Sequence, residues 1–396
     1  MPTTAAPAST SSKRLALSAL APGTVQSEIR AMSVACEQMG GINLAQGVCD
    51  TPVPPPVEEA AIKAIRDGHN IYTRLDGIGR LRTAIAAKQK RDYGLEYDPE
   101  TEVLVASGAT GGLHAACMAL LNPGDEVILF EPFYGYHTAT LRSLRMNPVL
   151  VPLDAPDWIL VADRLRKAVT AKTRAIVVNT PANPSGKIFT RAELEAVAEV
   201  CLEHDLFLFT DEIYEYFVYD GAQHISAATL PGMRERTIVI SGFSKTFSVT
   251  GWRLGYVTAD KKWMGAMSYF HDLTYVCAPS AFQHGAAAGL EQLPQSFYTE
   301  LATAHQDKRA RILAALTDAG LTPSTPAGAY YVLADASKLQ GTTSAEKARN
   351  LLAATGVASV AGSAFFRSGG GENLLRFCFA KIDDDLNEAC ARLRKL

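Results

Sequence analysis

Residues that could do chemistry follow five short apolar runs of this sequence. Lys245 lies in a loop of small residues, Asp211 follows an almost wholly apolar run, and a glycine-rich segment at 107–112 opens a helical pattern. Tyr134 and Asn183 come soon after two further runs. Such runs are typical of strands in an open α/β sheet, where ligands bind beyond the carboxyl ends of the strands. We therefore expect these residues to converge on one site.

The uncharged features each have an ordinary structural explanation beside a functional one. The segment 107–112 (SGATGG) can bind an anion at a helix N-terminus, although glycine-rich helix starts are often only tight turns. It is not a GxGxxG motif, and no GxxxxGK[ST] motif occurs, which disfavours a dinucleotide or P-loop site. Tyr134 could be a packed aromatic residue or a flat surface for a planar cofactor.

The charged features leave the same two interpretations open. Asp211 could cap the following turn or pair with a protonated ring nitrogen, since a buried carboxylate without a partner is costly. Lys245 lies eight residues before Arg253, and a lone lysine–arginine pair is normally a surface feature. The small neighbours Gly242 and Ser244 favour a functional loop over a solvated face.

The elements that would position these residues follow an α/β pattern. The apolar runs do not alternate with polar residues, as expected of strands that are covered on both faces. They predict a mainly parallel sheet with right-handed crossovers. The predicted strands are 102–106, 126–130, 175–179, 206–210 and 237–241, and the predicted helices between them are 112–121, 138–145 and 191–204.

A second, smaller α+β unit is expected after a long helical stretch at 283–320. Its predicted strands are 329–334, 357–361 and 374–380, and its predicted helices are 344–354 and 383–395. We expect four parts: a disordered tail at 1–14, an N-terminal arm at 15–47 that packs with the small unit, a large domain at 48–290 and a small domain at 291–396.

Composition excludes several other classes of protein. The 396 residues carry 38 basic and 41 acidic side chains, so attraction to nucleic acid or an anionic membrane is not expected. No apolar run approaches the 18 residues of a membrane span, and the alanine- and serine-rich start has no signal-peptide stretch. The seven cysteines are widely spaced, which disfavours a zinc site and fits a reducing, cytoplasmic location.

Four blocks of the sequence carry a resemblance to a known family. GFSKTFSVTGWRLG at 242–255 is similar to the pyridoxal-phosphate (PLP) attachment signature of class I and II aminotransferases. NTPANPSG at 179–186, TDEIY at 210–214 and YTRLDGIGRLR at 72–82 match other blocks of that family in order. The chain resembles fold type I PLP enzymes over about residues 25–395, most closely the kynurenine/glutamine and bacterial aspartate or aromatic aminotransferases.

The resemblance implies roles around the cofactor ring and its reacting carbon. Lys245 would bind PLP covalently and, when displaced by substrate, move the Cα proton. Asp211 would pair with the ring nitrogen and keep it protonated, so that the ring can accept electrons. Asn183 and Tyr214 would hydrogen-bond the phenolic oxygen, and Tyr134 would stack on the ring.

It also implies how the phosphate and the substrate would be held. Ala109 and Thr110 would donate an N–H and a hydroxyl to the phosphate, with Arg253 as its charged partner. Arg376 would bind the substrate α-carboxylate by a two-point contact, with Gly47 beside it and Asn183 also in reach of the substrate. Metal ligands are not expected.

Two departures from the family pattern and one partner residue complete the implied site. Gly242 stands where a phosphate-binding serine is common, so Ser241 or Ser244 would substitute. Tyr72 would reach the phosphate of a neighbouring subunit, which implies a homodimer with shared active sites. Arg74 replaces a common proline and would place a cation near the subunit boundary.

The implied activity is transfer of an amino group from an L-amino acid to a 2-oxo acid by a ping-pong mechanism. Alternatives are a PLP lyase, such as a cysteine-conjugate β-lyase, and a PLP-fold ligand-binding regulator. An aspartate enzyme would need a second cation, and one bacterial subgroup has a lysine where Thr110 stands here. The nearby aromatic residues instead favour neutral, aromatic, methionine or glutamine donors, with Arg74 as a possible partner for a distal carboxylate: Phe133, Tyr134, Tyr136 and Trp252.

Overall fold

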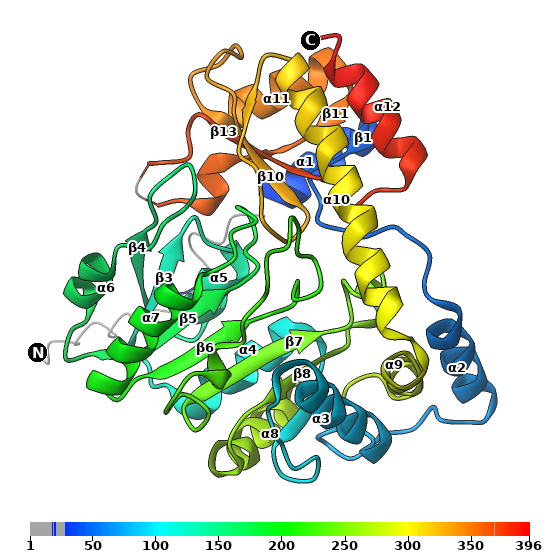
Figure 1. Cartoon of the computed structure of the whole chain (residues 1–396), viewed down its shortest axis with the longest axis vertical. Helices are drawn as coiled ribbons and strands as arrows, with labels where there is room; N and C mark the ends of the chain where they lie inside the picture. Colours follow the sequence, from blue (N-terminus) through cyan, green and yellow to red (C-terminus); the bar gives the residue numbers. More distant parts are fainter. Residues whose placement is uncertain (1–17, 19, 21–27, 368) are drawn as a thin grey trace, which may run out of the picture.

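The computed structural model describes residues 18, 20, 28–367 and 369–396 (Figure 1). The predicted tail at 1–14 and part of the predicted arm at 15–47 lie outside these residues. Within the described part of the chain, no helix is both long and apolar enough to cross a membrane.

The large sheet has seven strands in the order β2-β8-β7-β6-β5-β3-β4, and only β8 is antiparallel to its neighbours. This confirms the predicted α/β class with a mainly parallel sheet. All five predicted strands are present, while β4 and β8 were not predicted. The strands are β2 (Val103–Ala106), β3 (Glu126–Glu131), β4 (Asn147–Pro152), β5 (Thr173–Asn179), β6 (Phe207–Asp211), β7 (Thr237–Gly242) and β8 (Gly255–Thr258).

Helices cover both faces of this sheet, which explains the continuous apolar runs. On β3, Val127 and Leu129 pack into a core with α4 and α8, whereas Ile128 and Phe130 pack into a core with α7. The helices of this region are α2 (Pro55–Arg66), α3 (Gly79–Tyr93), α4 (Gly108–Leu120), α5 (Gly135–Ser143), α6 (Ala162–Ala168), α7 (Arg191–Glu203), α8 (Lys261–Tyr275) and α9 (Ser280–Gln292), with short 3₁₀ turns η1 (Ala227–Thr229) and η2 (Thr250–Trp252).

A smaller antiparallel sheet in the order β12-β13-β10-β9 lies at the other end of the molecule (Figure 1). Near it, β1 of the N-terminal segment pairs in parallel with β11. The elements here are α1 (Glu28–Gln38), β1 (Ile42–Asn43), α10 (Gln295–Asp318), β9 (Thr322–Pro323), β10 (Tyr331–Asp335), α11 (Ser344–Thr355), β11 (Val357–Ala358), β12 (Val360–Ala361), η3 (Gly362–Phe365), β13 (Leu374–Cys378) and α12 (Asp383–Leu393).

Two sequence predictions differ from the structure. The expected helical stretch at 283–320 is two helices, because Leu293 is extended and Pro294 is the N-cap of the second one. Proline lacks an N–H and disfavours helical backbone in the residue before it. The expected strand at 357–361 divides at Ser359 into β11 and β12, which pair with different partners.

Candidate active site

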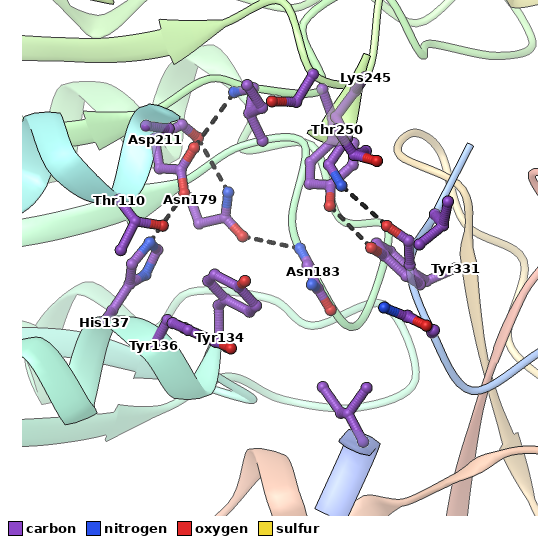
Figure 2. A pocket seen from close by; sticks show the side chains of 18 of the residues that line it. Thr110, Tyr134, Tyr136, His137, Asn179, Asn183, Asp211, Lys245, Thr250 and Tyr331 are labelled. Carbon is purple, nitrogen blue, oxygen red and sulfur yellow. Dashed lines mark hydrogen bonds and ion pairs between the residues drawn. The ribbon is translucent and has the colours of Figure 1, made fainter. Parts of the chain in front are cut away.

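A cavity of 630 Å³ lies where the carboxyl ends of the central strands meet the small-sheet end of the chain (Figure 2). The structure brings most of the sequence-predicted site residues to its wall, and Ser241 and Tyr72 are not among them. The predicted residues on the wall are Gly47, Ala109, Thr110, Tyr134, Asn183, Asp211, Tyr214, Ser244, Lys245, Arg253 and Arg376.

Lys245 lies three residues after β7, in the loop that precedes η2. Its Nζ donates a hydrogen bond to the carbonyl oxygen of Gly47, 2.9 Å away. Desolvation by the surrounding protein lowers the pKa of Lys245 to about 8. Roughly a tenth of this amine is therefore neutral at pH 7, and the neutral amine is the form that attacks a carbonyl carbon.

Asp211 ends β6 and is 8% exposed. Its Oδ2 lies 2.9 Å from Nε2 of His137, a buried residue in the first turn of α5. The backbone N–H of Ile213 donates to Oδ1 of the same carboxylate at 3.3 Å. The carboxylate is thus held in one orientation at the cavity wall. Sequence reasoning missed His137, although its place three residues after Tyr134 was a usable signal.

An anion cradle forms where β2 leads into α4. The helix begins at Gly108, and Ala109 and Thr110 line the cavity from its first turn. The guanidinium of Arg253 lies so close that a Cβ on Gly108 would be 2.5 Å from Nη2. Free N–H groups at a helix start together with an arginine are well suited to a phosphate.

Of the two candidate serines, the structure brings only Ser244 to this wall. Ser241 is fully buried on the other side of β7, where its hydroxyl donates to Oε1 of Glu215 at 2.9 Å. Because successive side chains of a strand point to opposite faces and Ile240 lines the cavity, the next residue, Ser241, points away from it.

Strand β13 contributes Arg376 to the cavity wall, and this residue is 1% exposed. Its Nη1 donates to Oδ1 of Asn183 at 2.9 Å, and its Nη2 donates to the Ala45 carbonyl. Its Nε is buried and has no partner within the described residues. An arginine with a donor to spare at a cavity wall can bind a carboxylate.

Tyr331 on β10 was not predicted and explains the glycine beside it. Its hydroxyl lies 2.8 Å from that of Tyr214, and a Cβ on Gly47 would lie 1.9 Å from this oxygen. Position 47 therefore has no room for a side chain. Burial raises the pKa of Tyr214 well above its ordinary value, so this phenol remains a hydrogen-bond donor.

The aromatic wall differs from the predicted one. Tyr134 and Tyr136 line the cavity, but Phe133 is buried and Trp252 stacks on Phe282 at a ring distance of 4.7 Å. Helix α1 supplies a further part of the wall that sequence reasoning missed, because nothing in its pattern points to the site. Its wall residues are Ile29, Arg30, Ser33, Val34 and Glu37.

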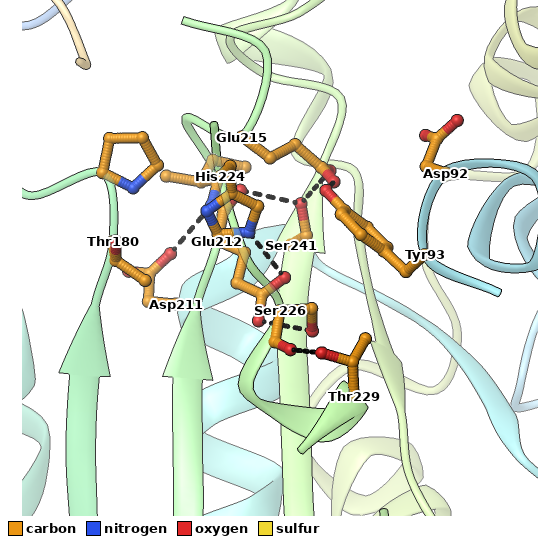
Figure 3. Close-up of polar contacts among 12 residues, drawn as sticks. Asp92, Tyr93, Thr180, Asp211, Glu212, Glu215, His224, Ser226, Thr229 and Ser241 are labelled. Atoms are coloured by element: carbon orange, nitrogen blue, oxygen red, sulfur yellow. Dashed lines mark hydrogen bonds and ion pairs between the residues drawn. The ribbon is translucent and has the colours of Figure 1, made fainter. Parts of the chain in front are cut away.

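A buried polar network supports the strands from behind the cavity (Figure 3). Glu212 accepts a hydrogen bond from Ser226 at 2.9 Å, and its other oxygen lies 3.0 Å from Nε2 of His224. Glu215 accepts hydrogen bonds from Lys88 and Ser241. Within the block 210–215, Glu212 and Glu215 thus belong to the network, whereas the other four residues line the cavity.

Tyr72 and Arg74 lie outside the main cavity. Tyr72 is 78% exposed and lines a second cavity of 590 Å³, whose wall shares Thr110, Tyr136 and Arg253 with the first. Arg74 is paired within its own chain: its Nη1 lies 2.6 Å from Glu100, and its Nη2 lies 2.7 Å from Asp76.

These groups fit PLP, the cofactor that the sequence resemblance implies. The cavity holds a lysine amine of lowered pKa, an oriented carboxylate for a ring nitrogen and a cradle for a phosphate. In that cradle a Cβ on Gly255 would lie 2.5 Å from the Ala109 nitrogen, so only glycine allows the start of β8 to approach the start of α4 this closely.

Comparisons with known proteins point to one family. The family model described as aminotransferase class I and II matches residues 40–393. A probable N-succinyldiaminopimelate aminotransferase of Mycobacterium tuberculosis is 38% identical, with 92% of this chain and 94% of the relative covered. A kynurenine–oxoglutarate transaminase of Dictyostelium discoideum is 35% identical over 90% of both chains.

Solved structures agree with these relatives. The N-succinyldiaminopimelate aminotransferase structure from Mycobacterium tuberculosis superposes with a TM-score of 0.93 and 36% identity, covering 96% of this chain and all of that one. YbdL of Escherichia coli, described with a methionine aminotransferase function, gives a TM-score of 0.92 at 30% identity, covering 97% of this chain and all of that one.

Proposed function

This chain belongs to the class I and II aminotransferases, which use PLP, and from this premise we propose that it transfers the amino group of neutral L-amino acids to 2-oxo acids. Aromatic amino acids, methionine and glutamine are the donors we propose. The observation that carries this choice is a cavity wall with several tyrosine side chains, on which Arg376 is the one deeply buried arginine among the described residues.

The chain's own residues prepare both substrates for reaction. When bound, PLP supplies an electron-accepting ring that stabilises negative charge at the substrate Cα. Lys245 holds the cofactor and, once released by substrate, moves the Cα proton through its amine. Asp211, oriented by His137, keeps the ring nitrogen protonated, while Tyr134 stacks on the ring. Donor and acceptor use the same groups in turn, which predicts ping-pong kinetics.

Positioning falls to the two ends of the cavity. Ala109, Thr110, Ser244 and Arg253 hold the phosphate, and Arg376 holds the substrate α-carboxylate beside Gly47. Asn183 is hydrogen-bonded to Arg376 and keeps its guanidinium in place, while Asn183 and Tyr214 also serve the phenolic oxygen.

An enzyme that prefers aspartate needs a second cation for the distal carboxylate, and the two positions considered for it do not supply one. Thr110 stands where one aspartate subgroup has a lysine, and Arg74 is occupied by Asp76 and Glu100. A short donor with a distal carboxylate would therefore place that charge against uncharged tyrosine side chains at the cavity wall.

A donor comparison tests this proposal. We expect kcat/KM for phenylalanine and methionine to equal or exceed that for aspartate and glutamate. Each donor alone, without a 2-oxo acid, should convert the cofactor to its pyridoxamine form. A lead of aspartate by a hundredfold, about 2.7 kcal/mol, would contradict the donor class. Loss of ammonia without formation of the pyridoxamine form would instead indicate a lyase.

We further propose a homodimer with shared active sites, in which Tyr72 reaches the partner's phosphate. Its support is an exposed apolar surface beside the second cavity, which includes Ile71 and Tyr72, 79% and 78% exposed. Exposed patches of this kind usually mark interaction sites.

We also propose the domain boundaries 48–290 and 291–396, with 15–47 as an arm of the small domain. The seven-stranded sheet and the four-stranded sheet fall on either side of residue 290, and the β1–β11 pair ties the arm to the small sheet. A cytoplasmic location is supported by the cysteines, all seven of which are free thiols.

A further inference from the structure

Helix α1 turns one face toward the cavity. The wall residues Arg30, Ser33, Val34 and Glu37 recur at spacings of three and four, so they form one stripe along the helix. Arg30 and Glu37 are seven residues apart, which separates their Cα atoms by about 10.5 Å along the axis. The rim of the cavity thus carries a positive charge at one end of α1 and a negative charge at the other.

Arg30 is the wall cation that the proposed mechanism does not use. Four of the described wall residues are lysine or arginine. Lys245 donates to Gly47, Arg253 to Thr250 and Arg376 to Asn183. The guanidinium of Arg30, by contrast, forms no hydrogen bond or ion pair with any described residue, and Glu37 is likewise without one.

We propose that Arg30 binds the terminal carboxylate of long dicarboxylic donors and acceptors, which makes it a specificity residue of the same site. The proposal rests on the proposed function, in which Arg376 binds the α-carboxylate. The same wall also carries uncharged residues, Val34 and Tyr136 among them. A carboxylate on a short side chain would remain beside such residues, whereas one on a longer chain extends to the rim and meets Arg30.

Glu37 determines at which end of α1 the terminal carboxylate would bind. A carboxylate at its end of α1 would face a like charge, so the favoured position for the terminal group is near Arg30. Because Arg30 is exposed, the interaction is screened by salt and adds selectivity rather than a large part of the binding free energy.

Binding of linear α,ω-dicarboxylates tests the proposal without any amino transfer. Calorimetry on the PLP-loaded enzyme would compare diacids of four to eight carbons. We expect the six- to eight-carbon diacids to bind more tightly than the four-carbon one, and R30Q to reduce that advantage about threefold. E37Q should increase it, and added salt should weaken it. The exposed Arg191 lies outside both cavities, so R191Q is the matched control and should leave the series unchanged.

Tightest binding of the four-carbon diacid, or an R30Q series that matches that of R191Q, would overturn the proposal. A parallel donor series gives the catalytic readout: R30Q should lower the ratio of kcat/KM for 2-aminopimelate to that for phenylalanine about threefold. Diacid binding that follows the prediction in a protein that performs no transamination would refute the proposed function alone.

Discussion

At the scale of single residues, the environment of Lys245 determines how readily the site can be loaded with cofactor. Its amine hydrogen-bonds Gly47, and the nearest charged groups do not offset the cost of burying an ammonium. The unfolded chain keeps this proton up to pH 10.5, the ordinary value, whereas the folded chain releases it near pH 8. This group therefore makes the cofactor-free protein more stable as the pH rises between these values.

The same shift predicts the pH dependence of cofactor loading. Only the neutral amine attacks the PLP carbonyl, so the loading rate of the cofactor-free protein should rise with pH and level off above about 8. Stopped-flow absorbance between pH 6 and 10 measures this loading rate. Nα-acetyl-lysine, which has a free ε-amine of ordinary pKa, is the control for the titration of PLP itself. A protein rate that climbs in parallel with acetyl-lysine up to pH 10 would show that Lys245 has an ordinary pKa.

The sequence predicted residues within recognisable blocks and missed residues that only the fold brings close. Lys245, Asp211 and Asn183 lie in such blocks and line the cavity. His137 had one local signal, its place three residues after Tyr134, but its role depends on α5 starting beside the end of β6. Tyr331 carries no local signal, because it reaches the cavity wall from β10 of the small sheet. The choice between two serines also required the structure, since it depends on where β7 ends.

At the scale of elements, the network around Glu215 joins α3 to the strands that support the site. Lys88 on α3 pairs with this carboxylate, and both side chains are nearly inaccessible, at 2% and 3% exposure. Burial alone would lower the pKa of Lys88, but Glu215 raises it above its ordinary value. The pair is therefore charged in the folded state, and each partner depends on the other.

Breaking this pair should be strongly destabilising. Glu215→Gln removes the nearer carboxylate of the buried Lys88 ammonium and leaves Asp92, 3.6 Å away, so the cost should approach but not exceed the roughly 3–5 kcal/mol of an uncompensated buried charge. Urea denaturation measures the loss of unfolding free energy. The matched control is Glu199→Gln, which breaks an exposed pair with Arg166 and should change stability little. Adding Lys88→Met to Glu215→Gln should recover part of the loss; equal effects of Glu215→Gln and Glu199→Gln would contradict this account.

Strands with continuous apolar runs were predicted from the sequence, whereas strands with short or mixed runs were missed. The five predicted strands are mostly buried; four of them lie inside the sheet and β2 lies at one edge. By contrast, β4 begins with Asn147 and Pro148 and is partly exposed at the other edge, and β8 is a four-residue strand that begins with Gly255. Short or mixed runs such as these do not distinguish a strand from a loop.

At the scale of the whole molecule, the second cavity and its apolar surroundings bear on assembly. Ile71, Tyr72, Leu273 and Tyr275 are all exposed in the single chain. Because the two cavities share Thr110, Tyr136 and Arg253, a partner covering this surface would touch the phosphate end of the site.

Complementation between two impaired variants tests this assembly. Lys245→Ala removes the cofactor lysine, and Tyr72→Phe removes the hydroxyl proposed to reach the partner's phosphate. Refolding the two together should restore some activity, because one site of each mixed dimer receives both intact residues. Each variant refolded alone is the control. Mixed dimers, verified by mass, that regain no activity would count against shared sites.

The central claim is that the cavity around Lys245 is where this enzyme holds PLP, and one measurement tests it most directly. Borohydride reduction of the PLP-loaded protein, followed by peptide mapping, identifies the lysine that carries the cofactor. We predict a single pyridoxyl label on the peptide containing Lys245 and none in Lys245→Ala. A label on another lysine would contradict the claim.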